Sequence, residues 1–417
     1  MTIIKEICQR AKTASVQMAK LTTDQKNAAL HQMANALEAN VEKILSANKL
    51  DVEAAKTKGL KDALLDRLTL DQKKIQTMAK ELREVCTLPD PIGTILSSWT
   101  RPNGLIISQT RVPLGVVGVI YESRPNVTSD AAGICIKAGN AVILRGGSDA
   151  LQSNIVIGNI LQEALSNTNV PKDAIQVVNS PERKDAEELM SMREYIDVLI
   201  PRGGADLIKT VIEKSKIPVI ETGTGNCHIY IDQDADLEMA TPIIINAKIQ
   251  RPGVCNAVEK ILIHKKIAQT YIPKIAAELQ KHGVEIRGDQ TTCQILTPQK
   301  IKEATEQDWH TEYLDLIIGI KVVENLTEAI THINKYSTKH SEAIITKDFT
   351  KATQFLQEID ATAVYWNAST RFTDGNQFGL GAEIGISTQK LHVRGPMSIQ
   401  NLTTTKYTIL GNGQTRN

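Results

Sequence analysis

Residues 115–148 read GVVGVIYESRPNVTSDAAGICIKAGNAVILRGGS and contain the pattern on which our fold prediction rests. A short β-branched run, Val116–Ile120, is followed by a segment with helical periodicity, Thr128–Lys137, and by a second apolar run, Ala141–Leu144. Two short strands separated by a helix are typical of a right-handed βαβ crossover, in which both strands lie parallel in one sheet. The stretch therefore predicts a doubly wound α/β domain.

The same alternation continues to about residue 221 and then recurs. The further strand candidates of the first series are Ile175–Val178, Ile196–Ile200 and Val219–Ile220, and its helical segments are Ala150–Leu165, Arg183–Met192 and Ala205–Lys214. The strand candidates of the second series are Ile261–Ile263, Leu316–Ile320, Ala343–Thr346 and Ala363–Trp366. Residues 1–88 have helical periodicity throughout. We predict two α/β domains in series, each with a doubly wound parallel sheet, behind an all-helical N-terminal part.

The segment Trp99–Ser108 fits neither sheet. It holds the turn signal Asn103-Gly104 between two extended runs, which predicts a β-hairpin. The tail Asn401–Ile409 is extended as well. An isolated hairpin is only marginally stable in water. The hairpin therefore either adds to another sheet, for instance in a partner subunit, or packs on its own domain, and the pattern alone favours neither.

The composition excludes several classes of function. The 417 residues include 48 Lys+Arg and 47 Asp+Glu, so a net charge of +1 gives no electrostatic case for a nucleic acid or an anionic membrane as partner. No stretch approaches the ~20 apolar residues of a membrane span, and the N-terminus lacks a secretory signal. The cysteines are scattered without a CxxC pair and the histidines without a ligand-like cluster. We expect a reduced, cytoplasmic protein without a metal.

Two strand-to-helix turns are candidates for a nucleotide site. Arg145-Gly146-Gly147-Ser148 follows one predicted strand, and Arg202-Gly203-Gly204 follows another. Nucleotides bind at the carboxyl ends of parallel strands, where glycine allows a close backbone approach and a helix N-terminus attracts phosphate oxygens. Neither turn is a complete GxGxxG motif, and Gly223–His228 lacks the third glycine. Because glycine is common in such turns whatever they bind, each turn by itself is a weak signal.

Cys255 is the candidate nucleophile. It lies in Arg251–Ala257, where proline and glycine favour a loop between the two predicted α/β domains. A thiol in such a loop can be exposed, and Arg251 nearby favours its thiolate. The alternative is that an unpaired cysteine is most often a small buried apolar residue. Cys135, on an apolar helical face, fits that alternative better.

Several motifs resemble those of one enzyme family. They are Tyr121–Thr128 (YESRPNVT), Glu221–His228 (ETGTGNCH), Arg251–Ala257 (RPGVCNA), Asn367–Phe372 (NASTRF), and Phe378–Thr388 (FGLGAEIGIST) continuing into His392–Pro396 (HVRGP). Between about residues 100 and 396 they follow the order of the gamma-glutamyl phosphate reductases, also called glutamate-5-semialdehyde dehydrogenases, which belong to the aldehyde dehydrogenase superfamily. The resemblance implies an aldehyde dehydrogenase-like fold.

The resemblance also implies a reaction, the reduction of L-glutamyl 5-phosphate to L-glutamate 5-semialdehyde in proline synthesis from glutamate. Cys255 matches the nucleophile, whose thiolate would displace phosphate and leave a thioacyl-enzyme for reduction. Asn126 matches the oxyanion-hole asparagine, although by itself it could equally cap the helix that begins near Thr128. Glu221 aligns with the glutamate that activates water in aldehyde-oxidising relatives. Its role stays open, because hydrolysis would destroy the intermediate.

The cofactor implied by the resemblance is a nicotinamide, and the residues favour NADPH. Arg145 stands where relatives carry a lysine that contacts the adenosine ribose, and Ser148 stands where many NAD-specific relatives carry an acidic residue. A cation gained and a carboxylate absent both favour a 2′-phosphate. Glu312 loosely matches a glutamate that holds the nicotinamide ribose. The predicted cofactor-binding residues are Arg145, Gly146, Gly147, Ser148, Gly203, Gly204 and Glu312.

The substrate carries a carboxylate, an ammonium and a phosphoryl group, so its site requires cations. The candidates, each within a family motif, are Arg124, Arg251, Arg371 and Arg394. The resemblance implies a homo-oligomer in which the hairpin contacts another subunit, with dimer or tetramer left open. It also implies a separate glutamate 5-kinase, whose transient contact would protect the labile acyl phosphate.

The domain boundaries that follow place the NADP(H)-binding domain at 1–98 and 113–240. The catalytic domain covers 241–396, and the oligomerisation element covers 99–112 and 397–417. Alternative functions are another aldehyde or acyl-CoA dehydrogenase on this scaffold, and a non-catalytic nucleotide-binding protein. The arginine-rich motifs argue against the first, and the presence of both Cys255 and Asn126 argues against the second. A cysteine hydrolase is disfavoured because no histidine lies within either motif that holds these two residues.

Overall fold

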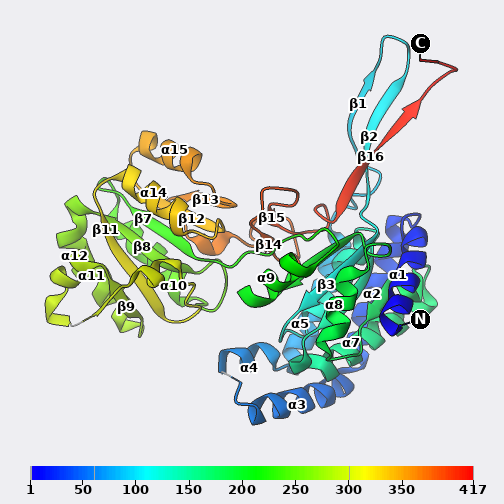
Figure 1. The fold of residues 1–417 in the computed structure, drawn as a ribbon, viewed down its shortest axis with the longest axis horizontal. Coiled ribbons are helices and arrows are strands. Elements are labelled where there is room, and N and C mark those ends of the chain that lie inside the picture. Colours follow the sequence, from blue (N-terminus) through cyan, green and yellow to red (C-terminus); the bar gives the residue numbers. More distant parts are fainter. Residues whose placement is uncertain (1, 61, 300, 417) are drawn as a thin grey trace. The chain divides into compact units, whose positions relative to one another are not determined.

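The structure is a computed structural model that describes residues 2–60, 62–299 and 301–416. The chain forms two compact units, each built around a parallel β-sheet (Figure 1). The first unit comprises Met1–Thr222, Gly379–Gly385 and Pro396–Asn417, and the second comprises Gly223–Phe378 and Ile386–Gly395. The predicted α/β class with two parallel sheets is confirmed.

The first unit begins with the predicted helical part. Its helices are α1 (Ile3–Met18), α2 (Thr23–Ala39), α3 (Val41–Thr57), α4 (Asp62–Leu68) and α5 (Gln72–Thr87). Thr22 and Gln25 form a reciprocal capping box at the start of α2. Asp71 caps α5 by accepting a hydrogen bond from the Lys74 N–H at 2.7 Å.

The parallel sheet of the first unit has the strand order β5-β4-β3-β6. Its strands are β3 (Val116–Tyr121), β4 (Ala141–Gly146), β5 (Ile175–Val177) and β6 (Val198–Arg202). The helices between and after them are α6 (Val127–Lys137), α7 (Leu151–Ala164), α8 (Arg183–Ser191) and α9 (Ala205–Lys214). The chain runs outward from β3 through β4 to β5 and then returns to place β6 on the other side of β3. The order therefore reverses beside β3, and such a reversal is where doubly wound sheets bind ligands.

One predicted strand of the first unit is absent as a strand. Val219–Ile220 makes only an isolated bridge, between Val219 and Leu199. Pro218, which precedes it, has no N–H to donate, so the ladder cannot extend in that direction.

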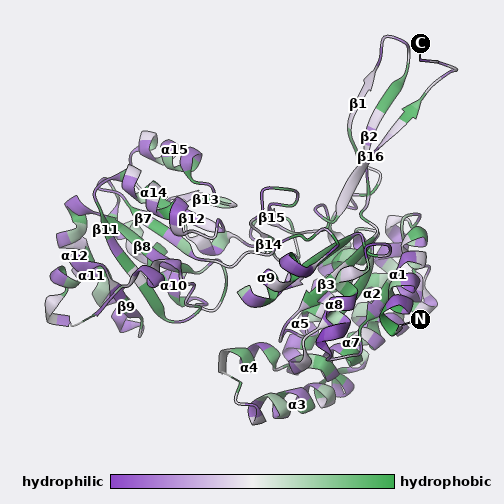
Figure 2. Ribbon diagram, in the orientation of Figure 1, coloured by the Kyte–Doolittle hydropathy of each residue, from purple (hydrophilic) through white to green (hydrophobic). Residues whose placement is uncertain are grey.

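Helices cover both faces of this sheet. On one face, Ile4, Ile7 and Cys8 of α1 pack with Val116 and Ile143 in a buried core that also takes in α8 and α9. The helices α6 and α7 contact β4 and β5, and α2 and α5 pack outside them. Apolar residues fill the strands and polar residues mark the outer helices (Figure 2). A sheet covered on both faces requires such continuous apolar strands.

The predicted hairpin is confirmed, and its third strand comes from the C-terminal tail. The strands β1 (Ile95–Thr100), β2 (Ile106–Pro113) and β16 (Thr403–Leu410) form an antiparallel sheet in the order β1-β2-β16. Gly104 takes a positive φ of 87° in the turn, as the Asn-Gly signal predicts. Large apolar side chains on this sheet are exposed, namely Ile95, Leu96, Trp99, Ile106, Tyr407, Ile409 and Leu410.

The second unit holds a parallel sheet in the order β10-β9-β11-β8-β7-β12-β13. Its strands are β7 (Cys227–Ile231), β8 (Val258–His264), β9 (Glu285–Gly288), β10 (Lys302–Glu303), β11 (Ile317–Val323), β12 (Ser341–Ile345) and β13 (Ala363–Trp366). Its helices are α10 (Leu237–Ile249), α11 (Lys265–Lys281), α12 (Gln290–Ile295), α13 (Glu306–His310), α14 (Leu326–Tyr336) and α15 (Phe349–Glu358). Two short strands, β14 (Ile386–Ser387) and β15 (Gly395–Pro396), pair with each other.

The contacts divide the chain between Thr222 and Gly223, whereas the sequence placed the boundary at 240/241. The reason is β7, which the sequence analysis missed and which pairs with β8 and β12 in the second sheet. This strand begins with Cys227 and His228, which are not typical strand formers.

No helix among residues 2–60, 62–299 and 301–416 is long and apolar enough to cross a membrane.

Candidate active site

The two glycine-containing turns of the first unit follow β4 and β6, the two strands that pair with β3. Tyr121, the last residue of β3, pairs with Gly146 of β4 on one side and with Arg202 of β6 on the other. The turns that follow β4 and β6 therefore flank the end of β3, where the strand order reverses. The two turns singled out from the sequence lie at one edge of one sheet, as a nucleotide site requires.

Arg145 lies half-buried at the end of β4. Its Nη2 donates to the carbonyl oxygens of Pro181 and Glu182 at 3.3 and 3.4 Å. Its Nε is buried and has no hydrogen-bond partner among the described residues. Burial lowers the pKa of Arg145, while the nearby Asp185 and Glu122 carboxylates act in the opposite direction. The side chain thus retains an unused donor, and buried donors are seldom left unpaired.

The two turns differ in how much space surrounds their glycines. A Cβ on Gly147 would meet only backbone atoms at 3.5 Å or beyond, so this position is open. A Cβ on Gly203 would lie 2.4 Å from Glu122 Oε2, and the Gly204 N–H donates to the same carboxylate oxygen at 2.9 Å. The N-terminus of α9 therefore already faces an anion. A phosphate bound there would compete with Glu122 for the Gly204 N–H.

Asn126 occupies the position before α6 but does not cap it. Its side chain makes no capping hydrogen bond. Instead Nδ2 donates to the Asp130 carboxylate, with Nδ2 and Oδ2 2.8 Å apart. The capping alternative raised by the sequence is thereby wrong, and the carboxamide is held by a residue one turn further along α6. The other candidates in the first unit, Arg124 and Glu221, are both half-buried.

Cys255 is half-buried in the loop between α10 and β8 in the second unit. The Cys227 thiol, at the start of β7, donates to the Cys255 carbonyl oxygen at 3.1 Å. A Cβ on Gly225 would lie only 1.5 Å from that same oxygen, so the two backbones pack directly against each other. Glu312 accepts a hydrogen bond from the Gly225 N–H at 2.6 Å. The loop that holds Cys255 thus rests on the segment that precedes β7.

Arg371 acts on the same thiol. Its Nε donates to Gln250 Oε1 at 3.0 Å, and its Nη1 donates to the side-chain oxygen of Asn256, the residue after Cys255. Burial lowers the pKa of Arg371, whereas the charge of a Cys255 thiolate raises it. By the same interaction the guanidinium stabilises that thiolate. Arg251 is exposed in this region, and its charge lowers the pKa of Arg371.

Arg394 has a different setting. It is exposed, and its Nη2 lies 2.8 Å from Asp360 Oδ1. Lys339 and Lys390 pair with the same carboxylate, at 2.9 and 3.2 Å. These hydrogen bonds hold the pKa of Asp360 well below its ordinary value. Arg394 therefore belongs to an ion-pair cluster around Asp360.

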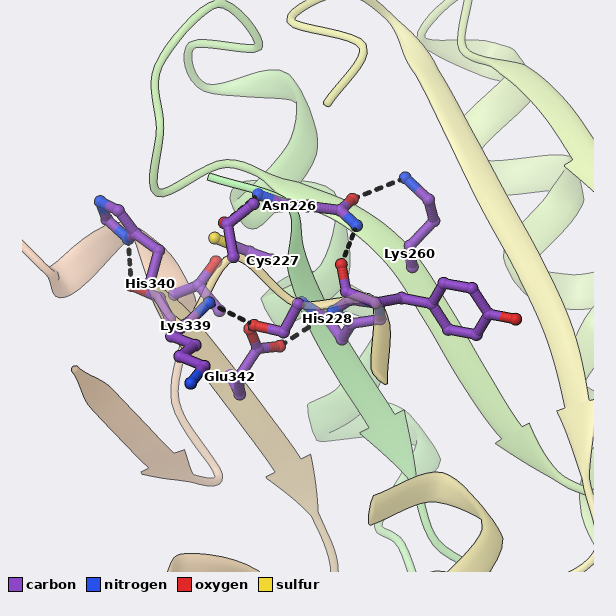
Figure 3. Close-up of polar contacts among 12 residues, drawn as sticks. Asn226, Cys227, His228, Lys260, Lys339, His340 and Glu342 are labelled. Carbon is purple, nitrogen blue, oxygen red and sulfur yellow. Dashed lines mark hydrogen bonds and ion pairs between the residues drawn. The ribbon is translucent and has the colours of Figure 1, made fainter. Parts of the chain in front are cut away.

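A buried polar network supports the segment that precedes β7 (Figure 3). The Asn226 amide donates to the carbonyl oxygens of Trp309 and Tyr336 at 2.7 and 2.8 Å, and its oxygen accepts from Lys260 Nζ at 2.8 Å. Glu342 accepts from the backbone N–H of His228 at 2.7 Å. Asn226, His228, Lys260 and Glu342 are all fully buried.

Burial sets the ionisation of this network. It raises the pKa of Glu342 to about 8 and lowers that of Lys260 to about 8. It also keeps His228 neutral by lowering its pKa well below the ordinary value. Groups this deeply buried are costly unless they are hydrogen-bonded. Their hydrogen bonds hold Asn226 and the backbone of His228 in place.

Comparisons with known proteins match the whole chain. A family model described as "Aldehyde dehydrogenase family" matches residues 2–307. The gamma-glutamyl phosphate reductase of Caldanaerobacter subterraneus is 59% identical over 98% of both chains, and that of Dictyoglomus turgidum is 58% identical over 99% of both. The crystal structure of the Thermotoga maritima gamma-glutamyl phosphate reductase is 50% identical and superimposes with a TM-score of 0.97 over all of both chains.

The chain belongs to the gamma-glutamyl phosphate reductases of the aldehyde dehydrogenase family. The aldehyde dehydrogenase family implies a nicotinamide cofactor. A more distant member shows the shared fold alone: an acetylating aldehyde dehydrogenase from Geobacillus thermoglucosidasius is 19% identical, with a TM-score of 0.71 over 99% of this chain and 97% of its own.

Sequence reasoning missed several residues that shape this gamma-glutamyl phosphate reductase site. Asp130, Lys260 and Glu342 lie outside or between the features singled out from the sequence. No local pattern indicates that the buried Lys260 and Glu342 contact motif residues. Asp130 alone had a signal, because a carboxylate four residues after Asn126 faces it across one helical turn.

Proposed function

We propose that the chain reduces L-glutamyl 5-phosphate to L-glutamate 5-semialdehyde and phosphate with NADPH, the second step of proline synthesis from glutamate. The observation that carries the proposal is the half-buried Cys255, with the Arg371 guanidinium hydrogen-bonded to the side chain of the next residue, Asn256. A thiolate next to a cation suits an acyl phosphate, which presents an electrophilic carbonyl and an anionic leaving group. The names and full-length identity of the relatives support this substrate.

In the proposed mechanism the Cys255 thiolate attacks the acyl carbonyl carbon. The C–S bond forms, the C–O bond to phosphate breaks, and the phosphate leaves with the bonding pair. The Asn126 carboxamide donates a hydrogen bond to the oxygen that becomes negatively charged during the attack. Arg371 and Arg251 attract the phosphoryl group, and the charge of Arg371 favours the thiolate. When bound, the reduced nicotinamide supplies the hydride that converts the thioester to the aldehyde.

The role that we propose for Glu221 differs from that of the matching glutamate in aldehyde-oxidising relatives. In a reductase of acyl phosphates, a carboxylate that activated water would hydrolyse the thioester and waste the intermediate. We therefore assign Glu221 to the handling of protons or to the orientation of the nicotinamide. The substrate roles of Arg124 and Arg394 likewise stay predictions, and the engagement of Arg394 with Asp360 makes it the weaker of the two.

The turns after β4 and β6 suit the adenosine end of NADPH. Arg145 offers a buried, unused Nε donor, Gly147 leaves its position open, and Ser148 adds no negative charge. These features favour a 2′-phosphate beside Arg145. The Glu122 carboxylate at Gly204 makes the turn after β6 a weaker phosphate site than the sequence suggested. Glu312, which holds the Gly225 N–H, is also proposed to bind the nicotinamide ribose.

Charge reversal at Arg145 tests the cofactor. Arg145→Glu is expected to raise KM for NADPH by about 100-fold and KM for NADH by less than about 5-fold, because only NADPH loses a charge-assisted hydrogen bond and gains a repulsion. Initial rates with each nucleotide measure this. Arg193→Glu, an exposed reversal in the same unit, should leave both constants unchanged. Equal increases for the two nucleotides would show that Arg145 does not read the 2′-phosphate.

The reverse reaction tests the proposed function itself. The wild-type chain is incubated with NADP and glutamate semialdehyde in its cyclised pyrroline form, with and without phosphate, and NADPH formation is followed. Turnover that requires phosphate supports an acyl phosphate reductase. Turnover without phosphate would indicate an aldehyde dehydrogenase that hydrolyses its thioester, with Glu221 as base. No turnover in either case would overturn the proposal.

Two further assignments complete the proposal. The first unit is the cofactor-binding part and the second unit is the catalytic part. The sheet β1-β2-β16 serves as the oligomerisation element, which its exposed Ile95, Trp99, Tyr407 and Leu410 support, because solvated apolar patches of this kind usually mark an interface. A transient contact with glutamate 5-kinase remains a prediction from the family.

A further inference from the structure

A pair of carboxyl groups lies behind Asn126, outside every motif used so far. Asp130 accepts the hydrogen bond from Asn126 Nδ2 at 2.8 Å, and the Glu81 carboxyl group in α5 acts on it as a neighbouring like charge. Ser129 Oγ lies 3.2 Å from the other Asp130 oxygen. Hydrogen bonds from Asn126 and Ser129 therefore hold both oxygens of Asp130. The negative charge of Glu81 disfavours a second negative charge on Asp130 and so raises the pKa of Asp130.

The packing of α5 on α6 brings these groups together. A Cβ on Gly133 would lie 2.4 Å from Leu82 Cδ2, so the two helices approach as closely as their side chains allow at this point. Glu81 directly precedes Leu82, and Asp130 lies three residues before Gly133 on the same face of α6. The contact between Glu81 and Asp130 is thus a consequence of how the helices pack.

An asparagine side chain has two N–H bonds and one acceptor oxygen, and the carboxamide can rotate by 180° to exchange them. An ionised carboxylate accepts and cannot donate, so it selects the orientation in which the amide nitrogen faces it. Among the described residues the Asn126 carboxamide makes no other hydrogen bond. Its second N–H is consequently available to a ligand.

We propose that Asp130, backed by Glu81, is the positioning residue that fixes the Asn126 carboxamide with one N–H available to the reacting carbonyl oxygen. This inference rests on the proposed function, in which Asn126 is an oxyanion donor. It goes beyond that function because it assigns a role to two carboxyl groups that touch neither substrate nor cofactor.

The charges around Asp130 make the orientation of the Asn126 carboxamide sensitive to pH. Burial, reinforced by Glu81, raises the pKa of Asp130, and Arg202 at the end of β6 acts in the opposite direction. Above this pKa Asp130 is ionised and holds the amide nitrogen. Below it the protonated carboxyl can donate to the amide oxygen, and the carboxamide can turn over. Oxyanion stabilisation should therefore weaken as the pH falls through the pKa of Asp130.

A double-mutant cycle tests the proposal without the cofactor or the glutamyl substrate. The probe is 4-nitrophenyl acetate, whose attack by the Cys255 thiolate forms an oxyanion and releases 4-nitrophenolate in a single burst. Asn126→Ala is expected to slow the burst by about 100-fold and Asp130→Asn by about 10-fold or more. The double variant should be no slower than Asn126→Ala alone, because Asp130 acts through Asn126. Thr77→Ala is the matched control, because this exposed α5 hydroxyl donates only to the Lys73 carbonyl oxygen, and it should change the rate by less than about 2-fold.

Additive losses in the double variant, or no loss in Asn126→Ala, would overturn the proposal. A second measurement covers the case in which Asp130→Asn does not fold. In Glu81→Gln the acid-side fall of the burst rate should move to lower pH, because the charge that raises the pKa of Asp130 is gone. Alkylation of Cys255 by iodoacetamide forms no oxyanion and should keep its pH profile.

Identical burst profiles in the wild type and Glu81→Gln would also contradict the proposal. The proposed function fails separately, on the phosphate requirement of the reverse reaction, which this burst does not involve.

Discussion

Replacing Cys255 with alanine is expected to lower kcat for the phosphate-dependent reverse reaction by at least about 10⁴-fold, because no other group in the proposed mechanism can form the thioester. The half-buried thiol loses only one sulfur atom, so the thermal midpoint should shift by no more than a few degrees. Following NADPH formation in the wild type and the variant, together with a thermal melt of each, measures both effects.

The matched control is Cys293→Ala. Cys293 is also half-buried in the second unit, where its thiol donates to the Gly288 carbonyl oxygen at 3.4 Å. Its loss should leave kcat within about 2-fold of the wild type. If Cys255→Ala kept phosphate-dependent turnover within 10-fold of the wild type, the assignment of Cys255 as nucleophile would be wrong.

Gly225→Ala should be nearly as damaging although it removes no reactive group. The new Cβ would lie 1.5 Å from the Cys255 carbonyl oxygen and 2.6 Å from its Cα, so the backbone that carries the thiol has to move by more than an ångström. Displacements of about that size cost roughly 100-fold in rate when they affect reacting atoms. We expect kcat to fall by about 100-fold or more, as measured by the reverse reaction at saturating NADP.

Gly283→Ala separates this effect from a general cost of replacing glycine. Gly283 follows α11 with a φ of 71°, and no atom lies within 4 Å of its would-be Cβ. Alanine there adds only backbone strain, about 1 kcal/mol of stability. It should lower the thermal midpoint and leave kcat unchanged. Equal kcat for Gly225→Ala and the wild type would mean that the contact with Cys255 does not position the thiol.

The sequence predicted the first sheet well because local pattern and tertiary role agree there. Val116–Ile120 and Ala141–Leu144 are apolar and rich in β-branched residues. Both form buried strands, one before and one after the helix α6. The second sheet was harder to predict from the sequence. The strand Cys227–Ile231 starts with a cysteine and a histidine that lie buried next to the network around Glu342. The N–H of His228 bonds to Glu342, which lies 114 residues away, and the local sequence cannot indicate a contact at that distance.

The candidate site likewise contains some residues that the sequence could predict and others that it could not. Arg145 and Gly147 could be found because a turn after a strand has a fixed place in a parallel sheet. The proximity of Glu81 to Asp130 could not be found, because it depends on how closely α5 packs on α6 at Gly133. The sequence also suggested that Asn126 caps a helix, and only the observed bond to Asp130 excludes this.

The three-stranded sheet has a consequence for the chain as it is made. β2 pairs with β16 from Pro113↔Thr403 to Ile106↔Leu410, so its partner lies about 290 residues downstream. At ribosomal speeds of about 5–20 residues per second, β2 waits roughly 15–60 s for that partner. Throughout this interval one edge of a long, partly apolar hairpin is open in the nascent chain. Correct pairing of this edge depends on completing synthesis, and a ribosome that stalls before residue 403 leaves an aggregation-prone product.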